Sequence, residues 1–163
     1  MKKSWPFLMI FLILVLFIQA CSCLSFIWGS NTVSIYFLAE KKINGGLLLP
    51  VDIIVVNDST GNEIVKTDPD KWFVSDKRKT LVRGKEIFQL AIKGGEFRKD
   101  TQIHINEHIK KIIIYANYNK QSSRESQQII LYPETWKNVY LIKLKKQEME
   151  QVFNYQNIGV FAQ

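Results

Sequence analysis

The sequence contains few cysteines and prolines, and it lacks the common motifs of catalytic and cofactor-binding sites. It has two cysteines and four prolines among its 163 residues. It contains no G-x-S-x-G nucleophile motif, no glycine-rich phosphate loop and no C-x-x-C pair. These motifs would identify the common hydrolases, nucleotide-binding proteins and metal or redox sites. We therefore predict no catalytic residue and no cofactor, and we expect a protein that is not an enzyme.

The N-terminal segment has the pattern of a secretory signal peptide. Lys2 and Lys3 precede an apolar run from Phe7 to Ile18, and Ala20 stands directly before Cys21. A basic region, a short apolar region and a small residue before the cleavage site are the three parts of such a signal. A cysteine directly after the small residue is typical of a bacterial lipobox, in which the thiol is acylated and the chain is cut before it.

We predict that residues 1–20 are removed, that Cys21 is lipidated with acyl chains such as palmitate, and that residues 21–31 form a lipidated tether. Two or three acyl chains anchor a protein stably, because each buried CH₂ contributes roughly 0.8 kcal/mol. Ser22, in the second mature position, fits the pattern sorted to the outer membrane of Gram-negative bacteria. Cys23 then has no partner in the chain, so the domain is expected to hold no disulfide and to depend on its hydrophobic core.

Two other interpretations of this segment stay open. The chain from Phe7 to Trp28 is long enough for an uncleaved signal anchor, but its strongly apolar part is shorter than the ~20 residues that cross a hydrocarbon core. A free secreted protein is the third interpretation. The two leading interpretations place the globular part outside the cytoplasm.

Despite a net charge of +7, the basic residues form no dense block, so we expect no binding to nucleic acid.

Residues 32–146 show the two-residue alternation of apolar and polar side chains that is typical of β-strands. In the first such run, Val33, Ile35 and Phe37 share one face. Turn signals rich in glycine, asparagine and proline separate the runs. We expect strands at 32–38, 47–57, 85–93, 101–106, 109–118, 127–132 and 139–145. Their number and spacing predict a mainly β domain, a two-sheet β-sandwich of immunoglobulin-like architecture.

One short helix is expected within this domain. The run Thr67-Asp68-Pro69-Asp70 offers a capping side chain and a proline suited to the first helical turn. Trp72 and Phe73 follow, and we expect them to fill the core.

Residues 57–62 have the composition of a polar loop. Residues 147–163 are expected to form a C-terminal tail or a short amphipathic helix, because their first apolar residues have helical spacing.

The segment from His104 to His108 is the one candidate metal site in the sequence. It fits the H-x-x-E-H pattern of inverted zinc peptidases, with Glu107 as the base. That motif works on a helix, where the two histidines share a face, whereas the alternation before it and the isoleucines after it predict strands. We therefore expect His104 and His108 at a junction between strands, with imidazoles that do not converge and bind no metal.

Five short motifs follow one another between Val33 and Leu144. They are Leu49–Asn57, Asp70–Phe73, Ile114–Tyr118, Tyr132–Trp136 and Val139–Leu141. Together they resemble the outer-membrane lipoproteins of type VI secretion systems. In that family a strand of the form l-P-V-d-v-v-x-V leads to a helix that ends in a Trp-Phe pair, and similar closing strands follow.

The resemblance implies a transthyretin-like β-sandwich that serves as a structural, scaffolding subunit of a secretion complex. The implied partners are the membrane, through acyl chains on Cys21, and the periplasmic domain of an inner-membrane secretion protein. The protein would lie at the periplasmic face of the outer membrane. No motif here matches the family's partner-binding loop, so no binding residue carries over. The alternatives are an envelope lipoprotein with an unrelated ligand-binding or pilotin-like role, and an envelope hydrolase that uses the two histidines.

Overall fold

A computed structural model describes residues 32–106, 108–119, 123–133 and 139–152 of the chain. The predicted signal peptide, Cys21 and the tether lie outside the described residues, and so does most of the predicted tail. Within these described ranges, no helix is long and apolar enough to cross a membrane.

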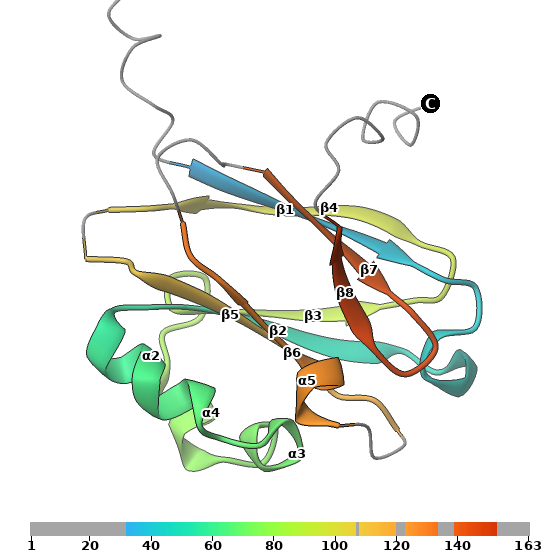
Figure 1. Ribbon diagram of the computed structural model, residues 1–163, viewed down its shortest axis with the longest axis horizontal. Helices are drawn as coiled ribbons and strands as arrows, with labels where there is room; N and C mark the ends of the chain where they lie inside the picture. Colours follow the sequence, from blue (N-terminus) through green and yellow to red (C-terminus); the bar gives the residue numbers. More distant parts are fainter. Residues whose placement is uncertain (1–31, 107, 120–122, 134–138, 153–163) are drawn as a thin grey trace, which may run out of the picture. The chain divides into compact units, whose positions relative to one another are not determined.

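The described chain forms two four-stranded sheets that pack face to face (Figure 1). Sheet A has the order β4-β1-β7-β8, and sheet B has the order β3-β2-β5-β6. The strands are β1 (Thr32–Ala39), β2 (Leu49–Val56), β3 (Ile87–Ile92), β4 (Phe97–His104), β5 (Lys111–Ala116), β6 (Gln128–Leu131), β7 (Val139–Leu144) and β8 (Met149–Val152). Neighbouring strands are antiparallel except β1 and β7, which are parallel. The prediction of a mainly β, two-sheet sandwich is confirmed.

Several short helices connect the strands, so the prediction of a single short helix is wrong. The described residues include η1 (Ile43–Gly46), α2 (Asp58–Val65), α3 (Pro69–Trp72), α4 (Asp76–Thr80) and α5 (Arg124–Gln127). Helix α2 occupies most of the segment that was expected to be a polar loop. It begins there because the Asn57 Oδ1 accepts a hydrogen bond from the Thr60 N–H at 3.0 Å, and Asp58 favours the positive end of the helix dipole.

Strand β8 replaces the tail or short helix that was expected from residue 147 onward. It pairs with β7, with Met149 opposite Leu144 and Val152 opposite Leu141. Apolar residues three apart fit one turn of a helix, but the hairpin buries Met149 in the core between the sheets. Burial in the sheet therefore decides the structure of this segment, and sheet A extends to Val152.

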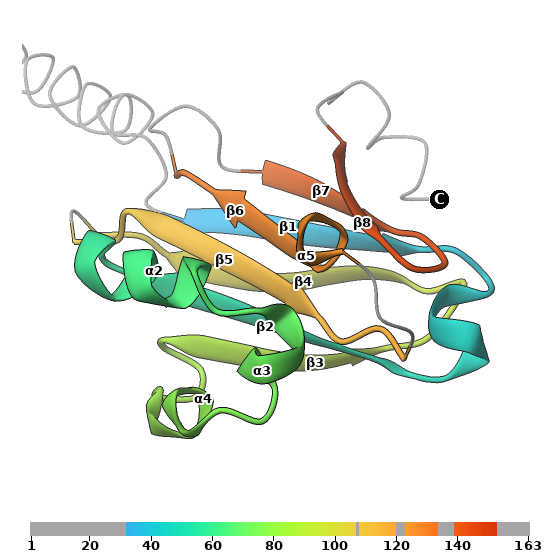
Figure 2. The same ribbon diagram turned by 60° about the horizontal axis from the view of Figure 1, so that its bottom comes forward.

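The core has two layers, one on each face of sheet B. Between the sheets, Ile35 and Phe37 of β1 pack in one cluster with Ile53 of β2. On the other face of β2, Ile54 and Val56 pack in a second cluster with Trp72. Figure 2 shows helices α2, α3 and α4 lying over this outer face of sheet B. Strand β2 is therefore buried on both faces, which explains its nearly continuous apolar sequence.

Candidate functional site

The two histidines of the candidate zinc motif lie on a strand end and a turn. His104 is the last residue of β4, and His108 follows in a turn where its N–H donates a hydrogen bond to the Asn106 Oδ1 at 3.0 Å. Both side chains are exposed, and Glu107 lies outside the described residues. The described part of the chain holds no group of three side chains able to bind a metal ion. The helix that the peptidase motif requires is not formed by the described part of this segment.

A buried carboxylate on β2 holds the connection between β2 and β3, residues 57–86, to sheet B; we call this connection the helical segment. Asp52 is 1% exposed. One of its oxygens accepts hydrogen bonds from the Trp72 Nε1 at 2.9 Å and the Arg78 Nε at 2.6 Å, and the other accepts one from the Arg78 Nη2 at 3.1 Å. The hydrogen bond that Arg78 donates to Asp52 raises the pKa of Arg78, whose guanidinium also lies 5.3 Å from the centre of the Phe73 ring. Both carboxylate oxygens have protein donors, so Asp52 acts as a structural clamp.

Trp72 connects this clamp to a second network around Tyr115 of β5. The two rings stack with their centres 5.4 Å apart. The Tyr115 hydroxyl lies 2.6 Å from the Ile64 carbonyl oxygen and accepts a hydrogen bond from the Gln128 Nε2 at 2.8 Å. Burial raises the pKa of Tyr115 to about 12. Trp72 is fully buried and Phe73 partly so, which confirms that they fill the core, and the polar groups here stabilise the fold.

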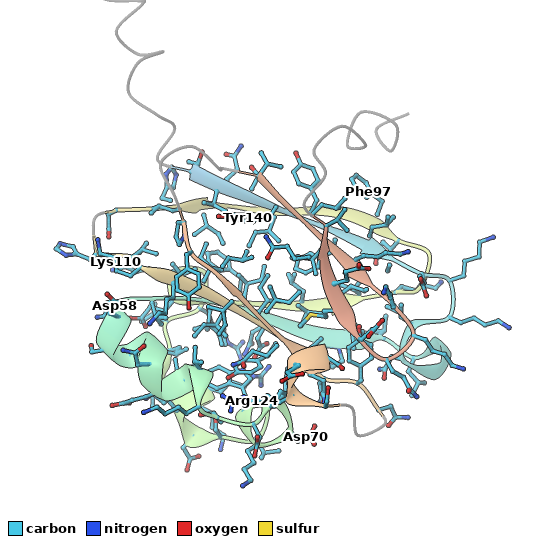
Figure 3. The ribbon with its side chains drawn as sticks, in the orientation of Figure 1. Asp58, Asp70, Phe97, Lys110, Arg124 and Tyr140 are labelled. Carbon is cyan, nitrogen blue, oxygen red and sulfur yellow. The ribbon has the colours of Figure 1, made fainter. Side chains whose placement is uncertain are left out.

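A different surface is formed by the loops at one end of the sandwich, which we call the loop end. It consists of residues 40–48, 93–96, 117–119 and 145–148. Figure 1 shows these connections together at one end, and β1 begins at the opposite end. Figure 3 places Asp58 and Lys110 at that opposite end.

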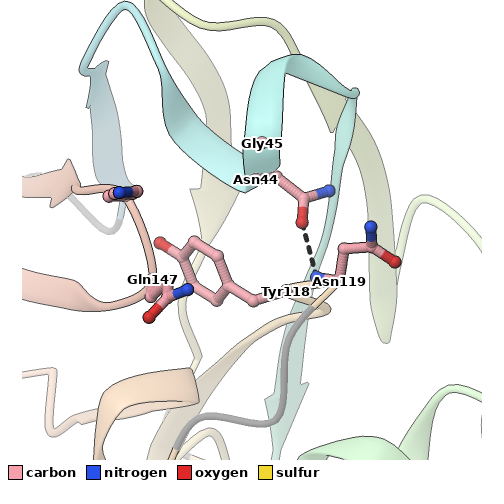
Figure 4. A pocket seen from close by; sticks show the side chains of 6 residues that line it. Asn44, Gly45, Tyr118, Asn119 and Gln147 are labelled. Carbon is pink, nitrogen blue, oxygen red and sulfur yellow. Dashed lines mark hydrogen bonds between the residues drawn. The ribbon is translucent and has the colours of Figure 1, made fainter.

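Asn44 fixes the conformation of the β1–β2 connection within the loop end. Its φ is +48°, in the left-handed region that asparagine tolerates better than most residues. Its Nδ2 donates a hydrogen bond to the Leu48 carbonyl at 2.9 Å, and its Oδ1 accepts one from the Asn119 N–H (Figure 4). Its own N–H donates to the Lys146 carbonyl at 3.3 Å. The side chain and the backbone of one buried residue, Asn44, thus join three of the four segments of the loop end.

The β3–β4 turn supports the same connection from another side. A Cβ on Gly94 would lie 2.4 Å from the Lys41 carbonyl oxygen, so only glycine fits this close backbone approach. The Gly95 N–H donates hydrogen bonds to the Ala39 and Glu40 carbonyls at 3.1 and 3.0 Å. The loop between β1 and β2 is therefore held in place by neighbours on several sides, and its conformation is preorganised.

Two leucines stand exposed on this preorganised loop. Leu47 and Leu48 are 58% and 57% exposed. Adjacent exposed leucines on a loop with a fixed conformation are the kind of apolar contact that a protein partner covers. Sequence analysis missed them because the run Leu47-Leu48-Leu49 has the composition of a strand start, whereas β2 begins at Leu49.

Beside the leucines, the loop end contains a small hollow and a paired lysine. The hollow has a volume of about 110 Å³ and is lined by Asn44, Gly45, Tyr118, Asn119, Lys146 and Gln147. The Tyr118 hydroxyl donates to the Glu148 carbonyl at 2.7 Å, and burial raises the pKa of Tyr118, so this group stays neutral. Hydrogen bonds to Glu148 and then Glu150 raise the pKa of Lys145. These groups suit hydrogen bonding and packing, and they provide no nucleophile with an adjacent base.

Comparison with known proteins identifies the fold. No protein-family model and no curated protein matches the chain. The Serratia marcescens protein Lip, described as a membrane-bound component of the type VI secretion system, has a TM-score of 0.61 and 16% identity over 77% of this chain and 98% of its own. For the type VI lipoprotein TssJ1 of Pseudomonas aeruginosa the TM-score is 0.58 and the identity 18%, over 74% of this chain and 94% of its own.

A third match is a chain in the structure described as the type VI secretion protein TssM C-terminal domain from EAEC. Its TM-score is 0.57 and its identity 13%, over 74% of this chain and 97% of its own. At these identities the likeness shows the fold. The chain therefore has the β-sandwich fold of the type VI secretion lipoproteins, as the motifs in its sequence predicted.

Proposed function

We propose that this protein is a lipid-anchored, non-enzymatic scaffolding subunit of a type VI-like secretion complex. Acyl chains on Cys21 would hold it at the periplasmic face of the outer membrane. The observation that carries the proposal is the fold, shared over 77% of the chain with the Serratia marcescens Lip protein and over 74% with TssJ1. The basic and apolar N-terminal run that ends at Cys21 supports the anchoring.

The topology of sheet A supports docking of the partner at the loop end. A lipidated tether of residues 21–31 would join the sandwich at Thr32, the first residue of β1. The eight residues of β1 span about 26 Å at roughly 3.3 Å per residue. The loop end lies beyond Ala39, at the other end of β1 from this junction (Figure 1). We infer that a protein that reaches across the periplasm from the inner membrane docks at the end of the sandwich that does not carry the tether.

The exposed leucines of the loop end supply the contact. Leu47 and Leu48 are presented on a loop whose backbone is already fixed by Asn44 and Gly94, so little conformational entropy is lost when a partner covers them. The partner that we propose is the periplasmic domain of an inner-membrane secretion protein. The matching chain in the structure of the TssM C-terminal domain supports this choice.

Binding of the TssM C-terminal domain of the same bacterium by the full-length lipidated protein in nanodiscs tests the proposal. The wild type should bind, and Leu47→Ser/Leu48→Ser should lose at least about tenfold in affinity, because it removes the apolar contact at the centre of the site. The matched control is Val74→Ser/Val82→Ser, which removes two exposed valines from the helical segment and should bind like the wild type. Absence of binding by the wild type would contradict the proposal.

The anchor is tested separately with Cys21→Ser. The variant should incorporate no labelled palmitate and should run as an uncleaved precursor, because cleavage of a lipobox depends on acylation of its cysteine. Cys23→Ser is the matched control and should be labelled and cleaved normally. Labelling that survives Cys21→Ser and disappears in Cys23→Ser would place the lipid on the other cysteine.

A further inference from the structure

The loop end carries lysines that have no carboxylate partner. Four of its exposed lysines form no ion pair with a described residue: Lys41, Lys42, Lys93 and Lys146. Most of the other lysines with a defined environment are neutralised, for example Lys79 by Asp76 at 2.7 Å. Elsewhere in the described part of the chain, Lys66, Lys85 and Lys110 are also exposed without an ion pair. Unpaired lysines are therefore most numerous at the loop end.

Backbone contacts bring these lysines together around the exposed leucines. Lys41 and Lys42 lead directly into η1, which precedes the leucines. Lys93 comes directly before Gly94, which packs against the Lys41 carbonyl. The Lys146 carbonyl accepts the hydrogen bond from the Asn44 N–H at 3.3 Å. The four lysines thus lie on three of the four segments of the loop end, and one of these segments also carries the two exposed leucines.

Two of the three acidic residues of this end, Glu40 and Glu148, pair with lysines other than these four. The third, Glu96, accepts a hydrogen bond from the Lys93 N–H at 2.9 Å. Glu40 lies 3.5 Å from Lys143. Glu148 and Glu150 lie 2.9 and 3.0 Å from Lys145. A partner that approaches the leucines therefore meets ammonium groups that its own carboxylates can pair with.

We propose, on the basis of the proposed function, that the segment of the partner that docks on the loop end is an acidic protein segment, with carboxylates beside bulky apolar side chains. Each part of the surface has a different effect on the kinetics. Unpaired rim charges attract an oppositely charged partner over long distances and raise the association rate. Covered leucines must be exposed again before the complex separates, so they set the dissociation rate. Salt should therefore slow association and leave dissociation almost unchanged.

Biolayer interferometry at about 50 mM and about 500 mM NaCl separates these effects, since salt screens exposed charges. The full-length lipidated protein is held in phosphatidylcholine nanodiscs, and the probe is the TssM C-terminal domain of the same bacterium. Lys41→Gln/Lys42→Gln/Lys93→Gln/Lys146→Gln should slow association about tenfold at the lower salt, with dissociation changed less than about twofold. Leu47→Ala/Leu48→Ala should do the reverse and speed dissociation about tenfold.

A matched control removes the same number of charges from the helical segment. Lys66→Gln/Lys71→Gln/Lys79→Gln/Lys85→Gln lowers the net charge equally and should associate like the wild type. An association rate that changes neither with salt nor with removal of the loop-end lysines would overturn this inference, but it would not contradict the proposed function. No binding by the wild type would overturn both. If the loop-end lysines instead bind phosphatidylglycerol vesicles and have no effect on the TssM domain, the surface is a lipid contact and the inference is refuted.

Discussion

Removal of the Arg78 guanidinium should destabilise the domain strongly, because it leaves the Asp52 carboxylate buried without its cation. The Asp52 side chain is 1% exposed and that of Arg78 is 26% exposed. Loss of one partner of a buried ion pair costs about 3–5 kcal/mol. In Arg78→Met the Trp72 Nε1 still donates to Asp52, and the vacated position is partly open to water. We therefore expect the lower end of the range, about 3 kcal/mol.

Urea unfolding of the purified protein, followed by far-ultraviolet circular dichroism, measures this cost. The midpoint should fall with an unchanged slope. Asp52→Asn/Arg78→Met removes both charges and keeps an acceptor for Trp72, so it should recover most of the lost stability. Lys79→Met is the control, because it breaks an exposed pair with Asp76 and should change stability by less than about 0.5 kcal/mol. A cost under about 1 kcal/mol for Arg78→Met, or no recovery in the double variant, would refute the reasoning.

Three further changes test the packing. Trp72→Ala should cost about 3–5 kcal/mol because a fully buried ring is lost; an unchanged urea midpoint would place Trp72 at the surface. Tyr115 should keep its proton until about pH 12. A tyrosine in the unfolded chain ionises near pH 10, about two units lower, so the stability linked to this group is present below pH 10 and lost as the pH rises towards 12. Ultraviolet difference titration against Tyr115→Phe checks this, and ionisation near pH 10 in the folded protein would contradict it. Gly94→Ala should lower both the urea midpoint and the affinity for the TssM domain, because its Cβ would lie 2.4 Å from the Lys41 carbonyl oxygen; retention of both would show that the loop shifts without cost.

The proposed docking site illustrates how a local pattern can mislead. Three consecutive leucines after a glycine turn extend the apolar run of the next strand, and the sequence predicts a strand that begins at Leu47. In the structure Asn44 turns the chain with a positive φ and holds the Leu48 carbonyl, so that regular pairing begins only at Leu49. The two leucines before it then project outward. Their exposure depends on the turn at Asn44, which is held by Asn119, 75 residues from Asn44 along the chain, and no local sequence signal encodes that contact.

The same distinction applies to the helical segment. The sequence identified Trp72 and Phe73 as core residues from their size and from the helix start before them. It did not identify Arg78 as the partner of Asp52, which lies 26 residues earlier. Charged residues are common in and around this segment, and their spacing in the sequence alone does not show which of them pairs with Asp52. The pairing follows from the way α3 and α4 fold back over β2.

The sequence by itself determined the features that depend on near neighbours. The two-residue alternation of apolar side chains determined the strands and the two-sheet sandwich, since one face of each strand must be buried. The basic and apolar run before Cys21 predicts the anchor for the same local reason. Tertiary structure decided the features that depend on distant segments. Strand β8 forms because β7 is available beside it, and the loop end exists because Asn44 joins three connections and the turn at Gly94 packs against one of them. Long-range burial and pairing override local preference at these positions, and the surface proposed to bind the partner is one of them.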